Sequence, residues 1–283
     1  MPSEKRQRQD EGRLTRLEEQ HVASKRSQRM RQLRSLGLLL GALLIVALLI
    51  SVLSSDDSTE VSSTDATSTT VATTTPGADD VAVVLPAPGA SITGETPCPE
   101  ADGSSERTTS FEQAPPTCID ESVTYTATLE TTEGQVVIEL DSAAAPETVN
   151  NFVVLSRYHY YDGVAFHRII PGFMNQSGDP VGPTPGTGGP GYTIPDELPE
   201  GDSPYPAGTL AMANTGQPAS GGSQWFIVVG SGGDQLTPTY SVFGHVTEGQ
   251  DVVDTINQFG DGATNGTPKT KVVTITSITI SES

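Results

Sequence analysis

From residue 122 onward, apolar and polar residues alternate in short runs, a pattern typical of half-buried β-strands. Two such runs occupy residues 122–130 and 135–140, and Glu133-Gly134 between them predicts a hairpin. Further strands are expected at residues 165–170, 209–214, 224–229, 240–246 and 272–280. This part of the chain is therefore predicted to be mainly β.

Two segments repeat their apolar residues at helical spacing instead. An apolar stripe runs along residues 146–161, and Pro146 suits the first turn of a helix there. Residues 251–259 predict a second, shorter helix. Many short strands and two helices between residues 122 and 283 indicate one compact domain, a closed antiparallel β-barrel capped by two α-helices.

The longest apolar run is LGLLLGALLIVALLISVL, residues 36–53, which carries no charge. Eighteen apolar residues are enough to span a bilayer as a helix. A cleaved signal peptide is the competing interpretation, but its apolar region is usually shorter and no small-x-small cleavage site follows the run. A helix packed in the core of a soluble domain is the third interpretation, but the run has no polar face. We therefore expect a single transmembrane signal anchor.

The formal net charge of −20 is unevenly distributed along the chain. Residues 1–35 carry ten Lys or Arg against five acids, whereas beyond residue 53 five Lys or Arg face thirty acids. The positive-inside rule then predicts a cytoplasmic tail at residues 1–35 and an extracytoplasmic chain after Ser54, in a single-pass protein of the cell membrane. So acidic a domain excludes nucleic acid as a partner, while basic partners or halophily stay open.

The segment after the predicted anchor is rich in hydroxyl side chains. In residues 54–75, fourteen of twenty-two residues are Ser or Thr, which leaves too few apolar groups to offset the entropy cost of ordering. A looser, proline-punctuated stretch continues to Pro97. The sequence therefore predicts a disordered stalk over residues 54–97.

Cys98 and Cys118 are the only cysteines in the chain. A pair in a segment assigned to the outside of the cell predicts a disulfide, because such bonds persist in oxidising compartments. In the chain-entropy model, closing a loop of this length contributes about 3 kcal/mol. A metal site would need further ligands nearby, and the sequence offers none at suitable spacing. The bridge is expected to pin a prefix, residues 98–121, to the following domain.

The stretch FHRIIPGFMNQSGD, residues 166–179, places Arg168 among large apolar residues. A charge removed from water is costly unless it is compensated. In one interpretation the arginine extends its head to solvent or pairs with a carboxylate. In the other, a bound substrate completes its surroundings.

Five blocks of sequence resemble the successive signatures of the cyclophilin family. They are FHRIIPGFMNQSGDP, GTGGPGYTIPDE, GTLAMANTG, GSQWFIVV and YSVFGHV, and the match runs from about residue 122 to 283. Members of this family are peptidyl-prolyl cis-trans isomerases built on an eight-stranded barrel with two helices. The anchor and the cysteine pair resemble those of exported cyclophilins from actinobacteria-like bacteria.

The implied reaction needs neither cofactor nor metal, because no covalent bond is broken. Rotation about an X–Pro bond crosses a barrier of roughly 18–20 kcal/mol that arises from amide resonance. A donor aimed at the proline nitrogen stabilises the twisted amide more than either planar form. Arginine suits this role because its fork stays protonated and rigid. An apolar pocket is needed for the proline ring.

The resemblance implies that Arg168 is the catalytic donor and that Gln176 orients it or its substrate. The implied substrate-binding residues are His167 at the rim, Phe173, Met174, Phe226 and Leu236 around the proline, Ala213, Asn214 and Thr215 along the peptide, and Gln224 near the arginine. Taken singly, the large apolar residues are more often core residues. Their company with Arg168 and Gln176 favours a pocket.

Two positions depart from the pattern of drug-sensitive members. Tyr240 stands where many eukaryotic members have a histidine of the pocket, and Gln235 stands where cyclosporin-sensitive members have a tryptophan. Loss of that indole removes a donor and a stacking surface for the drug. We expect weak cyclosporin binding with isomerase activity retained. Trp225 is expected to pack inside the barrel.

The sequence thus predicts a monomeric isomerase domain that acts on proline-containing polypeptides and assists the folding of exported proteins. The alternative is a proline-binding holdase or assembly module whose turnover is incidental. A third possibility is a structural protein that displays the barrel on its stalk as a scaffold. Replacing Arg168 discriminates among them, since catalysis alone depends on that side chain.

Overall fold

The computed structural model of the chain describes residues 81–201 and 204–283. The predicted cytoplasmic tail 1–35 and membrane span 36–53 lie outside these residues, as does most of the predicted stalk 54–97. Within the described ranges, no helix combines the length and the apolar character needed to cross a bilayer. The described residues comprise the prefix and the predicted barrel domain.

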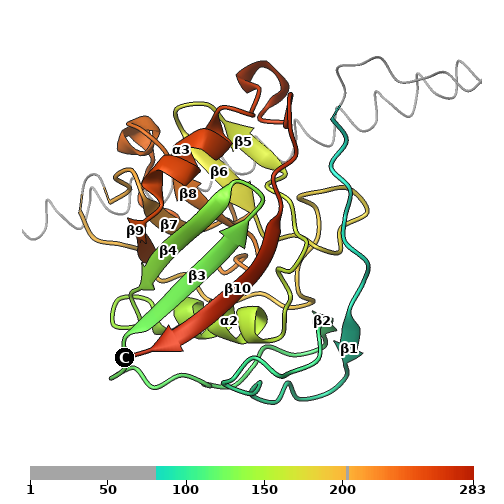
Figure 1. The fold of residues 1–283 in the computed structure, drawn as a ribbon. Helices are drawn as coiled ribbons and strands as arrows, with labels where there is room; N and C mark the ends of the chain where they lie inside the picture. The colour runs from blue at the N-terminus through green and yellow to red at the C-terminus, as the bar shows by residue number, and fades with distance from the viewer. Residues whose placement is uncertain (1–80, 202–203) are drawn as a thin grey trace, which may run out of the picture. The chain divides into compact units, whose positions relative to one another are not determined.

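Strands and helices follow one another along the described chain as Figure 1 shows. In order they are β1 (Ala90–Ile92), β2 (Thr108–Phe111), β3 (Tyr125–Thr131), β4 (Gly134–Leu140), α2 (Pro146–Arg157), β5 (Arg168–Ile170), β6 (Met174–Ser177), β7 (Thr209–Met212), β8 (Trp225–Val228), the 3-10 turn η1 (Gly232–Gln235), β9 (Val242–Glu248), α3 (Gln250–Asn257), the 3-10 turn η2 (Gly262–Thr264) and β10 (Ile275–Glu282). The fold is mainly β with two helices, as predicted.

Eight of the strands form one sheet in the order β10-β3-β4-β9-β7-β8-β6-β5, and each neighbouring pair is antiparallel. The predicted closure of the barrel is wrong. Its edge strands, β10 and β5, are not paired with each other. The segments that precede them are joined by an isolated bridge between Ala165 and Thr274 and by backbone hydrogen bonds such as Phe166 N to Val273 O at 2.9 Å. Pro171, which cannot donate to a ladder, follows directly on the three residues of β5 and so limits this edge.

The predicted hairpin is confirmed as β3 and β4, which pair along their full length from Tyr125 opposite Leu140 to Thr131 opposite Gly134. Alternate residues of both strands are buried, so the period-two pattern of the sequence marks the core face. Other predicted strands are shorter than expected: β5 begins at Arg168 and not at residue 165.

Both predicted helices are present, although α2 ends at Arg157 and not at residue 161. His159 then adopts a left-handed backbone with φ 54°, which stops the helix. At the other end, the Glu197 carboxylate accepts hydrogen bonds from the N–H groups of Glu147 at 3.0 Å and Thr148 at 2.8 Å. These bonds satisfy donors that every helix leaves free at its start.

In the view of Figure 1, α3 lies at the top of the strands and α2 lies at the bottom. α2 packs on β10, and α3 packs on β4, β5 and β6. Between them lies the main core, where Trp225 is fully buried as predicted and contacts the rings of Phe152, Tyr161 and Phe166. A second, smaller apolar cluster surrounds Phe226.

The prefix is ordered and joined to the domain. The predicted disulfide between Cys98 and Cys118 is confirmed. β1 and β2 form a parallel pair, and β1 falls inside the range that the sequence assigned to the stalk. The pairing explains this difference, because β1 draws its hydrogen bonds from β2 and its own sequence is too short to indicate a strand.

Candidate active site

Arg168 is the first residue of β5, and its Cα lies opposite that of Gln176 on β6. Residues directly opposite each other in an antiparallel pair project to the same face of the sheet. The Arg168 Nη1 accordingly donates a hydrogen bond to Gln176 Oε1 at 3.2 Å. The structure thus brings together the two residues that the resemblance marks as catalytic.

The same row continues across the sheet. Gln176 lies opposite Phe226 on β8, and Phe226 lies opposite Ala211 on β7. We call Arg168, Gln176, Phe226 and Ala211 the site row. Strand alternation therefore places a guanidinium, an amide and an aromatic ring side by side on one face.

A residue that sequence reasoning missed, Asn265, holds the other side of the guanidinium. Arg168 Nε donates to the Asn265 backbone carbonyl at 3.2 Å, and Arg168 Nη2 donates to Asn265 Oδ1 at 3.1 Å. Asn265 follows η2 and adopts a left-handed backbone with φ 59°. The Asn265-Gly266 pair signals a turn in the sequence, but nothing in it indicates contact with Arg168.

Arg168 is half-buried, and this desolvation lowers the pKa of its guanidinium, while nearby Tyr240 acts in the opposite direction. Arginine nevertheless stays charged in proteins. No carboxylate within the described ranges forms an ion pair with it. Its charge is therefore balanced by neutral oxygen acceptors, which leaves it available to a ligand.

Gln176 connects the arginine to a loop through a second amide. Gln176 Nε2 donates to Gln224 Oε1 at 3.0 Å, and Gln224 Nε2 donates to the carbonyls of Gly186 at 3.0 Å and Gly188 at 2.9 Å. The buried Asp179 carboxylate accepts the N–H groups of the same two glycines at 2.8 Å. The orientation of Arg168 is thus fixed through an ordered chain of hydrogen bonds.

Beside the arginine lies the smaller apolar cluster. Its buried members are Met174, Tyr205, Ala211, Phe226 and Val228, and the partly exposed residues packed against them are Ile170, Phe173, Ala213, Leu236, Tyr240 and Val242. All four residues predicted around the proline ring belong to it. The partly exposed members make part of this cluster accessible at the surface of the domain.

Tyr240 and Tyr205 define one side of this cluster. The rings of Phe226 and Tyr240 are perpendicular, with centroids 5.3 Å apart. The Tyr205 hydroxyl accepts the Tyr240 N–H at 2.9 Å and donates to the Tyr240 carbonyl at 2.9 Å. Burial raises the pKa of the Tyr205 hydroxyl. Sequence reasoning did not identify Tyr205 as part of this cluster. Gln235, which stands where the resemblance places the tryptophan of cyclosporin-sensitive members, is exposed at the end of η1.

A groove of about 490 Å³ adjoins the site row. Its walls include Gln176 and Gln224, the predicted peptide-binding residues Ala213, Asn214 and Thr215, and the loop from Gly186 to Thr193. Asn214 Nδ2 donates to the Thr239 carbonyl at 2.8 Å, which ties this wall to the segment before Tyr240. The Ala213 N–H donates to the Gln224 carbonyl at 2.9 Å.

His167 lies outside the apolar cluster. Its ring faces Gly186, where an added Cβ would come within 2.8 Å of His167 Cδ2, and it lines a separate cavity with Pro185 and Lys269. Burial and repulsion from Arg168 lower the pKa of His167 to about 4, although Asp179 opposes the shift. The imidazole is therefore neutral near pH 7.

Within the described residues, no group of three or more His, Cys, Asp or Glu could hold a metal ion.

Comparison with known proteins bears directly on this fold and site. The model of the family described as cyclophilin type peptidyl-prolyl cis-trans isomerase matches residues 126–280. A peptidyl-prolyl cis-trans isomerase A of Mycobacterium tuberculosis is 45% identical over 179 residues, which cover 56% of this chain and 93% of the relative. A peptidyl-prolyl cis-trans isomerase of Synechococcus elongatus is 54% identical over 101 residues, covering 36% of this chain and 66% of the relative.

Solved structures of cyclophilin type isomerases are similar to this chain in both fold and sequence. The crystal structure of a cyclophilin type peptidyl-prolyl cis-trans isomerase of Cryptosporidium parvum matches with a TM-score of 0.50 and 31% identity, covering 56% of this chain and 98% of that one. A second structure of that protein was determined in the presence of the dipeptide Ala-Pro. The chain belongs to the cyclophilin type peptidyl-prolyl cis-trans isomerase family, and it is an isomerase of that class.

Proposed function

We propose that Arg168 catalyses rotation about an X–Pro bond whose proline ring rests on the Phe226 cluster. The observation that carries this proposal is the site row, in which a charged donor without a carboxylate partner among the described residues lies beside a partly exposed apolar cluster. No nucleophile, metal or cofactor enters the mechanism.

The chemistry follows from amide resonance. As the X–Pro bond twists, the proline nitrogen regains a lone pair that neither planar isomer possesses. The three hydrogen bonds to Gln176 and Asn265 use three of the five N–H groups of Arg168, so two donors remain for the substrate. A donor that meets the lone pair stabilises the twisted state selectively, and such selectivity is what accelerates a reaction.

The substrates are proline-containing polypeptides. The structure of the Cryptosporidium parvum relative in the presence of the dipeptide Ala-Pro, which contains one X–Pro bond, supports this substrate class. The apolar cluster excludes water from the ring, and residues 213–215 on the adjoining groove receive the rest of the peptide in extended form. Gln235 offers no indole to cyclosporin, so the drug binds weakly while isomerisation is retained.

The cellular role we propose is assistance to the folding of exported proteins at the outer side of the cell membrane. The apolar run 36–53 between a basic tail and an acidic chain supports this location. The Cys98–Cys118 disulfide supports it independently, because disulfides persist in oxidising compartments. Slow X–Pro isomerisation limits the folding of many chains, so an isomerase is useful there.

A refolding assay tests this function against the holdase alternative. The full chain, purified in detergent, should accelerate the proline-limited refolding phase of a client protein, and the Arg168→Ala variant should lose this acceleration. Both forms should bind the client equally, because Arg168→Ala leaves the apolar cluster intact. If the variant accelerates refolding as well as the wild-type chain does, the protein acts by holding its client and the proposal is wrong.

A further inference from the structure

The disulfide-closed loop of the prefix, residues 98–121, is attached to helix α2 at one end and to Tyr158, the residue after α2, at the other. Near Cys118, the backbone N–H of that cysteine donates to Asn150 Oδ1 at 2.7 Å, and Asn150 Nδ2 donates to the Pro116 carbonyl at 2.9 Å. Near Cys98, the Tyr158 hydroxyl donates to the Pro97 carbonyl at 2.8 Å. The loop that the disulfide closes is thereby fixed to the helix and to the residue after it.

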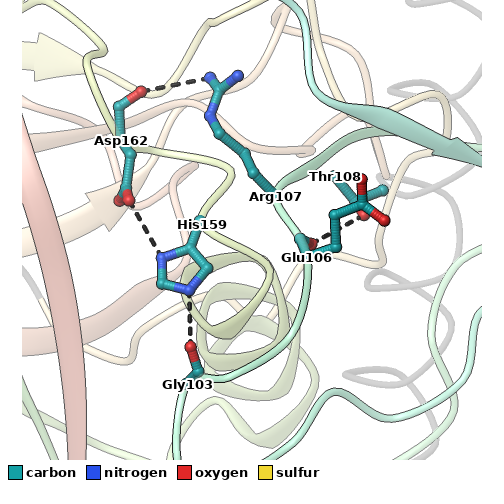
Figure 2. A network of polar contacts seen from close by, with 6 residues as sticks. All are labelled: Gly103, Glu106, Arg107, Thr108, His159 and Asp162. Atoms are coloured by element: carbon teal, nitrogen blue, oxygen red, sulfur yellow. Dashed lines mark hydrogen bonds and ion pairs between the residues drawn. The ribbon is translucent and has the colours of Figure 1, made fainter.

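A second set of contacts joins the middle of the prefix to the turn after α2 (Figure 2). Arg107 Nη2 donates to the Asp162 carbonyl at 3.3 Å, and His159 bridges the Asp162 carboxylate at 3.1 Å and the Gly103 carbonyl at 2.8 Å. The Thr108 N–H donates to the Tyr158 carbonyl at 2.9 Å. These contacts fix the start of β2 against the domain.

β2 ends at Phe111, whose side chain is only 2% exposed. Its ring packs against Tyr158 at 5.4 Å and, edge-on, against Tyr192 at 6.2 Å between centroids. The Phe111 N–H donates to the Pro190 carbonyl at 2.8 Å. A Cβ added to Gly191, where φ is +111°, would lie 2.2 Å from the Phe111 carbonyl oxygen. The prefix is thus in direct contact with residues 190–192.

Those same residues form part of the groove beside the site row, because Pro190 and Tyr192 both line it. One end of this wall is fixed by Asp179 and Gln224 through Gly186 and Gly188. The other end is fixed by Phe111 and by the Tyr192 hydroxyl, which donates to Asn151 Oδ1 at 2.7 Å. The position of the groove wall therefore depends on a residue of the prefix.

The family model begins its match at residue 126, beyond the prefix. Phe111 and the disulfide are consequently additions to the part of the chain that the family model covers. Phe111 does not itself line the groove, but it contacts Pro190 and Tyr192, which do. The addition therefore supports part of the groove wall from behind.

We propose that Phe111 is a positioning residue for substrate recognition: the disulfide-closed prefix holds Pro190–Tyr192 in place and so preforms the groove for peptide residues flanking the X–Pro bond. This inference rests on the proposed function. A preformed groove lowers the ordering cost of binding, so the benefit falls on substrates long enough to enter it. A substrate confined to the proline cluster gains nothing.

The test compares two substrates on the full chain in detergent by exchange NMR. One is a capped Ala-Pro dipeptide, and the other is a longer peptide with the same Ala-Pro between flanking residues. For Phe111→Ala, KM for the longer peptide should rise about threefold to tenfold, with kcat unchanged and no change for the dipeptide. Gly191→Ala disturbs the same contact from the groove side and should give the same selective loss.

Ile278→Ala is the matched control, because Ile278 is a buried member of the main core on β10 that does not line the groove. It should lower the melting temperature without separating the two substrates. Equal losses on both substrates for Phe111→Ala and Gly191→Ala, or no loss on either, would overturn the proposed role of Phe111. A wild-type chain inactive on both substrates would instead contradict the proposed function.

Discussion

The two faces of strands β5, β6, β8 and β7 carry different sets of residues, which we call the site row and the core row. The site row consists of Arg168, Gln176, Phe226 and Ala211, whereas the core row consists of Ile169, Asn175, Ile227 and Leu210. Neighbouring residues along each strand thus belong to different rows. Ile169, Ile227 and Leu210 lie in the main core, and Phe226 and Ala211 lie in the smaller cluster.

This comparison explains how a charge can lie in so apolar a stretch of sequence. Ile169 and Ile170 follow Arg168 in sequence. Ile169 belongs to the main core, whereas Arg168 lies on the other face beside Gln176, and Ile170 packs against the smaller cluster. The apolar residues around it in the sequence therefore serve two different surfaces. A segment that is apolar along its length can carry one polar, half-buried donor without placing it in the core.

The largest expected effect separates adjacent residues of β8. Ile227 is 1% exposed in the core row, so Ile227→Ala should lower the free energy of unfolding by about 2–5 kcal/mol through lost burial and a cavity. Its kcat at temperatures where it stays folded should match that of the wild-type chain. Chemical denaturation with an isomerase assay measures both. A fall in kcat with stability preserved would contradict the prediction that the core row affects stability and not catalysis.

His167 and Arg168 are neighbours in sequence, but the His167 imidazole is neutral near pH 7 whereas the Arg168 guanidinium is charged. This difference gives a prediction for the pH dependence of stability. Burial lowers the pKa of His167 to about 4, whereas the imidazole of an unfolded chain has a pKa of about 6.5. Between these values the unfolded state binds the proton and the folded state does not, so stability falls as pH decreases. The loss should reach about 2 kcal/mol between pH 7 and pH 5.

Replacing this imidazole isolates its contribution from that of carboxylates that titrate in the same range. The His167→Gln variant should lose less stability over this interval than the wild-type chain does. Denaturation midpoints at the two pH values provide the measurement. Identical pH dependence in the two proteins would mean that His167 is not buried as a neutral group.

A smaller effect is expected at Asn265, which orients Arg168. Asn265→Gly keeps the left-handed backbone and the carbonyl that accepts Arg168 Nε, but it removes the Oδ1 acceptor for Nη2. Loss of one such hydrogen bond should lower kcat about threefold to tenfold with little change in KM. Asp261→Asn, at the N-cap of the neighbouring turn η2, is a control that leaves both contacts to Arg168 in place. Equal kcat values for Asn265→Gly and wild type would exclude a positioning role.

Much of this arrangement could be predicted from the sequence. Period-two alternation indicated β3 and β4, and the apolar stripe after Pro146 indicated α2. The family resemblance, and not periodicity, marked Phe173, Met174, Phe226 and Leu236, which the structure gathers in one cluster. Local patterns and family motifs predicted those elements and residues whose sequence pattern lies within one short segment.

Other features depend on contacts between distant segments. Asn265 reaches Arg168 across 97 positions of sequence, and no local pattern reports such a contact. β6 reads Met-Asn-Gln-Ser, which has little strand character, and it is stabilised by buried amide contacts such as Asn175 Nδ2 to the Val253 carbonyl at 2.9 Å. The open edge between β5 and β10 and the pairing of β1 with β2 are likewise tertiary outcomes.

The central claim is that Arg168 acts on the twisted amide, while the core row maintains the fold. The most direct test is the cis–trans exchange rate of an Ala-Pro peptide at saturating concentration on Arg168→Ala, measured by NMR together with the melting temperature. We predict that kcat falls about 10²- to 10³-fold with the melting temperature unchanged. A kcat equal to that of the wild-type chain would contradict it.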